Sequence, residues 1–133
     1  MRIPILFLTL LAAACAPTPK EIEQAQAREA TQQEKLDKEL AGLTPGKPTN
    51  CLPNFRTQQA AAYGSTILYK VSNGLVYRSE TNGGCSTIGR DVLVTRTFNG
   101  QTCSGDIAFT VDRTGGFQTG SCFFGQFTPY RKP

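Results

Sequence analysis

"STILYKVSNGLVYRSE", residues 65–80, is the stretch that decides the fold class. Two runs rich in β-branched and aromatic residues flank Asn73-Gly74, a dipeptide whose residues tolerate positive φ and so favour a tight hairpin turn. The stretch therefore predicts two antiparallel strands. Tyr69 and Tyr77 should then lie roughly opposite each other across the pair.

The downstream chain repeats this pattern of short strands. Apolar runs at residues 90–98, 106–111 and 117–130 are separated by glycine-containing turns. Regular short strands between such turns indicate an antiparallel all-β domain. We therefore expect a mainly β fold, either a small antiparallel sheet or a partly closed barrel. Residues 54–63 could form a first strand or a short helix, because their alanines leave both open.

Four cysteines lie in the β region: Cys51, Cys85, Cys103 and Cys122. An even number indicates disulfides in a chain that is exported, as the N-terminal residues described below predict, and four cysteines allow three pairings. None is spaced as CxxC, which disfavours a redox or zinc motif. We expect the two bridges to stabilise the fold by about 3 kcal/mol each through loop closure.

The register of the last hairpin suggests the pairing. A turn centred on Thr114 places Asp106 opposite Cys122. Cys103 lies three residues before Asp106, so a bulge at Gly105 would bring the two thiols together. We therefore expect a Cys103–Cys122 bridge, which leaves Cys51–Cys85 as the second.

The chain begins with a charged Met1-Arg2 followed by an apolar run from Ile3 to Ala14. Twelve helical residues reach only about 18 Å, too short to span a bilayer, so residues 1–14 are expected to be a signal peptide. The segment ending at Cys15 resembles the lipobox of bacterial lipoproteins. That resemblance implies a mature N-terminal Cys15 carrying palmitate and other acyl chains. An ordinary signal peptide, with Cys15 incidental, is the alternative.

The segment after Cys15 predicts a tether. Residues 15–47 are expected to form a lipidated linker and a helical stalk over Glu21–Leu43, because this stretch is rich in strong helix formers. Its sparse apolar positions favour a solvated stalk over a helix that pairs with a partner. Prolines and glycines then break the helix, and residues 48–133 are expected to form the disulfide-stapled β domain.

Composition limits the function classes. The chain has no histidine, which excludes the usual Ser–His and Cys–His nucleophile pairs and weakens metal binding. The β domain has only four carboxylates (Glu80, Asp91, Asp106 and Asp112), and turn or capping roles account for most of them. We expect no catalysis, no cofactor and no metal site. No basic run is long enough for a nucleic-acid binder.

The domain is nevertheless mildly cationic. Residues 47–133 carry nine basic and four acidic side chains, which favours an anionic envelope component or envelope protein as partner. An aromatic and basic binding face is one interpretation, with four candidate residues: Tyr69, Tyr77, Arg78 and Arg96. In the alternative interpretation the tyrosines cover the edge of a core made by four other aromatics: Phe109, Phe117, Phe123 and Phe127.

The domain from Cys51 to Pro129 resembles a group of small, uncharacterised bacterial envelope lipoproteins. The resemblance lies in the Tyr77-Arg78 pair, the spaced cysteines and a Gly-x-Cys-x-x-Gly-x-Phe motif at residues 120–127. It implies a disulfide-bearing domain, and no activity is known for the group. Ala16 after the lipidated cysteine, by resemblance to sorted lipoproteins, favours the outer membrane over retention in the inner membrane. We expect the domain to face the periplasm.

The function expected is therefore that of a lipid-anchored, monomeric, non-catalytic binding or envelope-structural module. The alternative is an inhibitor of a periplasmic hydrolase, since the small lipidated β-barrels that inhibit lysozyme are similar in architecture. Such an inhibitor would insert a rigid loop, Asn82–Cys85 or Asp112–Gly116, into an enzyme cleft.

Overall fold

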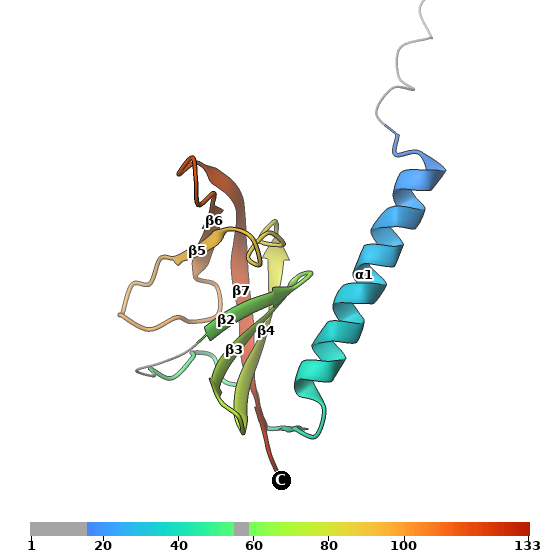
Figure 1. Cartoon of the computed structure of the whole chain (residues 1–133). Coiled ribbons are helices and arrows are strands. Elements are labelled where there is room, and N and C mark those ends of the chain that lie inside the picture. Colours follow the sequence, from blue (N-terminus) through green and yellow to red (C-terminus); the bar gives the residue numbers. More distant parts are fainter. Residues whose placement is uncertain (1–15, 55–58) are drawn as a thin grey trace, which may run out of the picture.

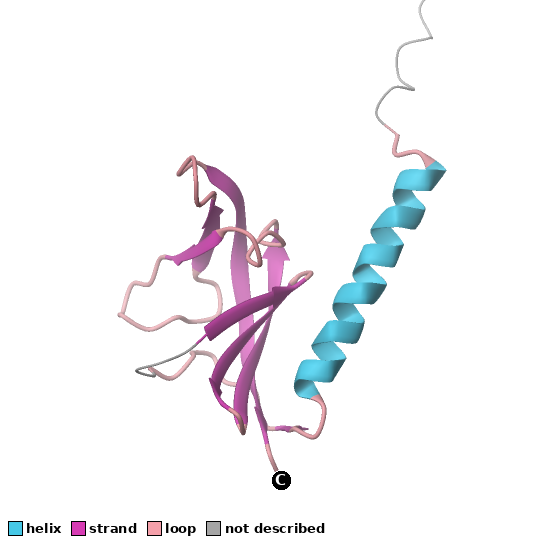
Figure 2. Ribbon diagram, in the orientation of Figure 1, coloured by secondary structure: helices cyan, strands magenta, loops and turns pink. Residues whose placement is uncertain are grey.

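A computed structural model describes residues 16–54 and 59–133. The fold is mainly β, as predicted: a curled antiparallel half-barrel sheet with two disulfides and one long helix beside it (Figures 1 and 2). The strand order is β2-β3-β4-β7-β6-β5, and β1 pairs with the end of β7. The elements are α1 (Pro19–Leu40), β1 (Thr44–Pro45), β2 (Gln59–Tyr63), β3 (Thr66–Ser72), β4 (Leu75–Gly83), β5 (Val92–Thr95), β6 (Ile107–Val111) and β7 (Gln118–Arg131).

The predicted hairpin of residues 65–80 is confirmed as β3 and β4, with Tyr69 directly opposite Tyr77. Its turn differs from the expected type, because neither Asn73 nor Gly74 has positive φ. Instead the register shifts between Lys70 and Ser72, so a bulge supplies the twist that a mirror-image turn would have given. In the ambiguous 54–63 region, residues 59–63 form β2, and residues 55–58 lie outside the described part.

The helix is also confirmed, and α1 begins where its capping chemistry places it. Thr18 caps the helix in a capping box: the Glu21 amide donates to the Thr18 hydroxyl, and the Glu21 carboxylate accepts from the Thr18 amide. Pro19 occupies the first helical position, where its missing N–H costs nothing. After the cap at Ala41, Gly42 takes the left-handed φ of 74° that ends the helix.

The helix is not a free stalk, contrary to the interpretation of a solvated tether. Leu36 is buried on the outer face of the sheet, where it packs with Leu68 of β3 and Val76 of β4. Thr44 and Pro45, inside the predicted linker, pair with β7. Only a few side chains on the last turns provide this contact, but they are enough to hold α1 against the domain.

Both predicted disulfide pairings are wrong. The structure joins Cys51 to Cys103 and Cys85 to Cys122. The error comes from the register of the β6–β7 hairpin, because Ala108, and not Asp106, lies opposite Cys122.

The loop geometry explains both bridges. Near Cys122 the β6–β7 register differs from the expected one by two residues: the turn supplies one, because Val111 lies opposite Gln118 and not Phe117, and the shift between Thr110 and Val111 supplies the other. Cys103 lies in the loop before β6. There it forms a bridge partner of Cys51. On the other side of β7, Gly83 of β4 pairs with Cys122, so the chain two residues later brings Cys85 within reach.

The core lies inside the curl of the sheet. Phe127 and Phe124 are almost fully buried there with Ile67, Tyr69 and Tyr77. The predicted core position of Phe127 is confirmed. The prediction is wrong for the three other phenylalanines: Phe117 and Phe123 are exposed, and Phe109 lies on the outer face, partly exposed.

Candidate binding surface

The two tyrosines of the predicted aromatic face are core residues. Tyr69 and Tyr77 are 5 % and 4 % exposed and point into the curl of the sheet. The Tyr69 ring packs against Phe124 and Phe127, with ring centroids 6.3 and 6.1 Å away. Burial raises the pKa of the Tyr69 phenol. Neither ring can therefore serve as a surface platform.

Arg78 lies on the other side of the sheet from these rings. Its guanidinium bonds Glu80 two residues along the same strand, at 2.6 Å from Nη2 and 2.7 Å from Nε. The Thr66 hydroxyl donates to the same carboxylate from the neighbouring strand. Arg78 thus belongs to the outer face near α1, and its charge is already partnered.

Arg96 lies on the outer face at the far edge of the sheet, just beyond β5. Its guanidinium sits 5.5 Å from the centroid of the Phe109 ring, a cation–π contact. The four sequence-predicted binding residues therefore occupy three separate places: the tyrosines in the core, Arg78 beside α1 and Arg96 over β6. The structure does not bring them together.

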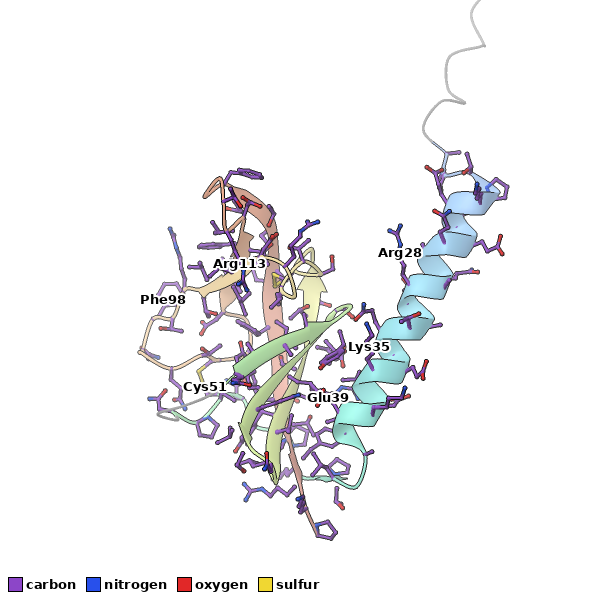
Figure 3. The ribbon with its side chains drawn as sticks, viewed as in Figure 1. Arg28, Lys35, Glu39, Cys51, Phe98 and Arg113 are labelled. Atoms are coloured by element: carbon purple, nitrogen blue, oxygen red, sulfur yellow. A yellow bond between two sulfur atoms is a disulfide. The ribbon has the colours of Figure 1, made fainter. Side chains whose placement is uncertain are left out.

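The outer face of the sheet has two halves. One half, over β2, β3 and the end of β7, is covered by α1: Leu36 and Leu40 pack with Tyr63 and Tyr130 there. Glu39 projects from α1 toward the sheet (Figure 3) and pairs with Lys70 of β3 at 2.5 Å. The Tyr63 hydroxyl donates to the same carboxylate at 3.2 Å. The bond from Lys70 lowers the pKa of Glu39.

The other half, formed by β5, β6 and the start of β7, carries an apolar surface that no described element covers. We call it the uncovered outer face. It consists of cross-strand neighbours with their side chains outward: Val92 beside Val111, Val94 beside Phe109, and Ile107 beside Phe123. Phe123 is 52 % exposed and Val92 is 46 % exposed. Val92, Val94 and Arg96 share this outer face, as do Ile107, Phe109 and Val111 on the neighbouring strand.

The inward side of the same strands is mixed: Ala108, Cys122 and Leu93 pack in the core, and a group of hydroxyls lies beside them. Thr110 is fully buried, and its hydroxyl lies 3.0 Å from that of Thr87 and 2.9 Å from that of Thr119. The Thr119 hydroxyl also lies 2.6 Å from the Asp91 carboxylate. The Thr87 side chain also hydrogen-bonds the Asp91 carboxyl. Each hydroxyl has one proton to donate, so Thr119 gives its proton to the carboxylate and accepts from Thr110.

Asp91 ends this hydroxyl chain. Its side chain is 1 % exposed, and Nε of Arg90 lies 3.4 Å from its second oxygen. The hydrogen bond from Thr119 lowers the pKa of the Asp91 carboxyl. All of these groups hold one another in place behind the sheet, so the chain of hydroxyls has a structural role in fixing the loop of residues 84–91 to β6 and β7.

The most exposed charges near the ends of β5 and β6 are positive. Arg90, Arg96 and Arg113 are exposed. The three carboxylates of this half of the domain are engaged by internal hydrogen bonds: Asp91 by Thr119, Asp106 by the Cys103 amide, and Asp112 by the Thr114 and Gly115 amides. The uncovered outer face is therefore apolar, and the exposed arginines at the ends of β5 and β6 form a cationic rim, while the three carboxylates keep their charge but are less exposed.

The predicted lipidation site, Cys15, lies outside the described residues. Within residues 16–54 and 59–133, no helix is both long and apolar enough to cross a membrane. The same residues contain no group of three or more Cys, Asp or Glu side chains placed to hold a metal ion. The four domain cysteines are all accounted for by the two disulfides.

No family model, no curated protein and no solved structure matches this chain. Sequence reasoning missed the uncovered outer face as a surface. The sequence of β6 contains a usable signal: Ile107, Phe109 and Val111 alternate with Ala108 and Thr110. Successive side chains of a strand point to opposite faces, so the three large apolar side chains share one face, which must be either covered or exposed. The assumption that apolar residues face inward concealed it.

Proposed function

We propose that the protein is a lipid-anchored, non-catalytic binding module of the bacterial cell envelope, and that its binding surface is the uncovered outer face. The observation that carries the proposal is the contiguous outward row of Val92, Val94, Ile107 and Phe123. Monomeric proteins rarely expose apolar residues in contiguous patches, and such patches with a polar rim mark interaction sites.

The composition of the rim supports binding over simple exposure. Arg96 lies over Phe109, so the cation and the apolar surface form one unit. Arginine and aromatic residues are enriched where proteins make contacts, and Lys and Glu are depleted. Among the apolar residues of the uncovered outer face, no lysine or glutamate interrupts the row along β5 and β6.

The anchor rests on the sequence, with support from the disulfides. A short apolar run ends at Cys15, the position that would be acylated in the resemblance described above. Two formed disulfides are typical of exported proteins, since thiols stay reduced in the cytosol. Only residues 16–18 separate Cys15 from the first helical residue, Pro19, so the anchor would hold the domain close to the bilayer.

The inhibitor alternative has one specific observation in its favour, the exposed β6–β7 turn. Residues 112–117 form a tight loop held by the Asp112 carboxylate, with Phe117 62 % exposed beside it. The other suggested loop, Asn82–Cys85, is not free to enter a cleft. Asn82 and Gly83 pair with β7, and the Gly84 amide donates to the Ser121 carbonyl at 2.7 Å.

The test of the proposed function uses the exported full-length chain in a bacterial host. A photo-crosslinking amino acid at Phe123 should form adducts in intact envelopes, and the same amino acid at Asn73, in the β3–β4 turn, should not. Val94→Glu, which places a carboxylate in the uncovered outer face, should abolish the adduct formed at position 123. Ala60→Glu, the matched change on the opposite edge strand β2, should leave it unchanged.

Intact mass of the membrane-extracted protein, read on the same samples, reports the anchor. A mass without acyl chains, or equal adduct yields at positions 123 and 73, would refute the proposal.

A further inference from the structure

Resting on the proposed function, we propose that the occupant of the uncovered outer face is the anionic lipid surface of the membrane itself, with the β6–β7 turn as the leading point of contact. The apolar side chains would enter the interfacial region, and the arginines at the rim would bind lipid phosphates. Three observations carry this choice of partner: the shape of the surface, its exposed charges and its position relative to the start of α1.

The shape favours a broad partner. The sheet curls around its core, so the uncovered outer face is the convex side of a half-barrel. It carries short and medium side chains, with Val92, Val94 and Ile107 between two exposed phenylalanines, Phe117 and Phe123. Such a surface can lie on a soft apolar boundary along its whole length, because lipid deforms to meet it.

The exposed charges favour an anion. Arg96 lies over Phe109, Arg90 and Arg113 are exposed in the segments that flank β5 and β6, and the nearby carboxylates are less exposed than these arginines. An arginine can lay its aliphatic stem along apolar surface while its guanidinium reaches phosphate. A second copy of the chain, docked about a two-fold axis, would bring these arginines toward one another, and like charges facing each other oppose association.

The position of the helix brings this surface to the membrane. Figure 1 shows the N-terminal end of α1 and the β6–β7 turn at the same end of the molecule, with the β3–β4 turn and the C-terminus at the other. The helix therefore runs beside the sheet and does not lie beneath it as a stalk. An anchor a few residues before Pro19 would put the bilayer at the end of the molecule where the β6–β7 turn, with the exposed Phe117 at its close, lies.

The chain offers a clean reporter because it contains no tryptophan. We would prepare the full-length, lipid-anchored protein with one substitution at a time: Phe117→Trp at the leading turn, Phe123→Trp on the uncovered outer face, and Asn73→Trp at the opposite end as control. Each would be reconstituted into vesicles of phosphatidylethanolamine and phosphatidylglycerol, with and without brominated acyl chains that quench tryptophan on contact.

The expected result is that the F117W and F123W proteins lose at least half of their tryptophan emission in brominated vesicles, with a blue shift, and that the N73W protein is not quenched. In vesicles of phosphatidylcholine alone the quenching should weaken. Removing rim charge by Arg90→Ala or Arg113→Ala should weaken association in phosphatidylglycerol vesicles by about fivefold per arginine, and this loss should disappear at high salt.

Several outcomes would overturn the inference. Unquenched emission from both F117W and F123W in lipid alone would mean that a protein partner covers the face. A blue shift that rises with protein concentration in the absence of bromine quenching would mean a second copy. Equal quenching in vesicles of phosphatidylcholine alone would show that the face does not recognise anionic lipid. If the intact mass shows acyl chains while quenching fails, the inference alone falls; if acyl chains are absent, the proposed function falls as well.

Discussion

At Asp91, a carboxylate with 1 % of its side chain exposed sits at the end of three threonine hydroxyls. Buried charges are tolerated only when hydrogen bonds replace the lost water, and the Thr119 hydroxyl supplies the shortest one here. From the sequence, Asp91 is expected to pair with the preceding Arg90 or to act as a cap, and the contact with Arg90 at 3.4 Å agrees with pairing. The threonine chain could not be predicted, because Thr87, Thr110 and Thr119 come from separate segments.

This site should make stability depend on acidity. The hydrogen bond from Thr119 lowers the pKa of Asp91 from the ordinary value of 3.8. The ionised carboxylate therefore adds to the free energy of unfolding at pH values above 3.8. The contribution is lost as pH falls through the lowered pKa of the folded state. We expect Asp91→Asn to reduce the free energy of unfolding at pH 7, and the difference from wild type to shrink as pH is lowered below about 4.

Urea unfolding at a series of pH values measures this difference. Asp37→Asn, which alters an exposed carboxylate on α1, is the matched control and should track the wild type throughout. A stability difference between wild type and Asp91→Asn that stays constant down to about pH 2 would contradict the proposed role of the carboxylate.

The cysteines give a second test at the residue scale. Cys85 and Cys122 are 37 residues apart in the chain and joined within the core, so replacing both with alanine should lower the free energy of unfolding by about 3–4 kcal/mol. Peptide mapping without reduction should show one peptide pair containing Cys51 and Cys103 and another containing Cys85 and Cys122. A Cys103–Cys122 peptide would show that the register of the β6–β7 hairpin is the one expected from the turn alone.

At the scale of elements, strand identities were predictable and registers were not. The runs that became β3, β4, β5, β6 and β7 all show the β-branched and aromatic residues of strands. Register depends on bulges, and three of the antiparallel pairings contain one: β3–β4, β4–β7 and β6–β7. A bulge adds a residue without a sequence signature strong enough to locate it. The bulge in the β6–β7 pairing, together with a one-residue error in the position of the turn, misassigned both disulfides.

The helix shows how a weak amphipathic signal becomes a tertiary contact. Sparse leucines near the end of α1 are too few to predict a coiled coil, yet Leu36 is 1 % exposed against the sheet. Glu39 reinforces the contact from the same turns through Lys70 and Tyr63. The sequence does not show where the apolar surface that these leucines cover would lie, because Leu68 and Val76 come together only in the folded sheet.

This contact predicts a specific mutational difference. Leu36→Ala should lower the free energy of unfolding by about 2–3 kcal/mol, because it empties a buried site between the helix and the sheet. It should also raise amide hydrogen exchange along α1. Ile22→Ala is the matched control, because Ile22 is 45 % exposed on the first turns and should change stability little. Equal effects of the two substitutions would mean that α1 is not docked.

At the scale of the whole molecule, the outer face of the sheet has a half that is covered by α1 and a half that is not. The half that is not covered carries apolar residues of similar character to those under α1, with a rim of arginines. The mainly β class, the helix and the presence of two bridges followed from local patterns. Which face of each strand points outward did not, because that depends on the order of strands in the sheet.

The candidate binding residues show the same limit. Tyr69 and Tyr77 are the cross-strand aromatic pair that the hairpin predicts, but the curl of the sheet turns the pair inward. Arg96 is the one candidate that belongs to the surface now proposed, since it lies over Phe109.

The most direct measurement of the central claim is a footprint of the uncovered outer face. Hydrogen exchange and carbene labelling would be compared between the lipid-anchored protein in native envelope membranes and the same protein in detergent at high dilution. We predict protection in membranes confined to segments 92–98 and 107–124, with segments 59–72 unchanged. Equal labelling of Val94, Ile107 and Phe123 in the two samples would contradict the claim that this face is where the protein binds.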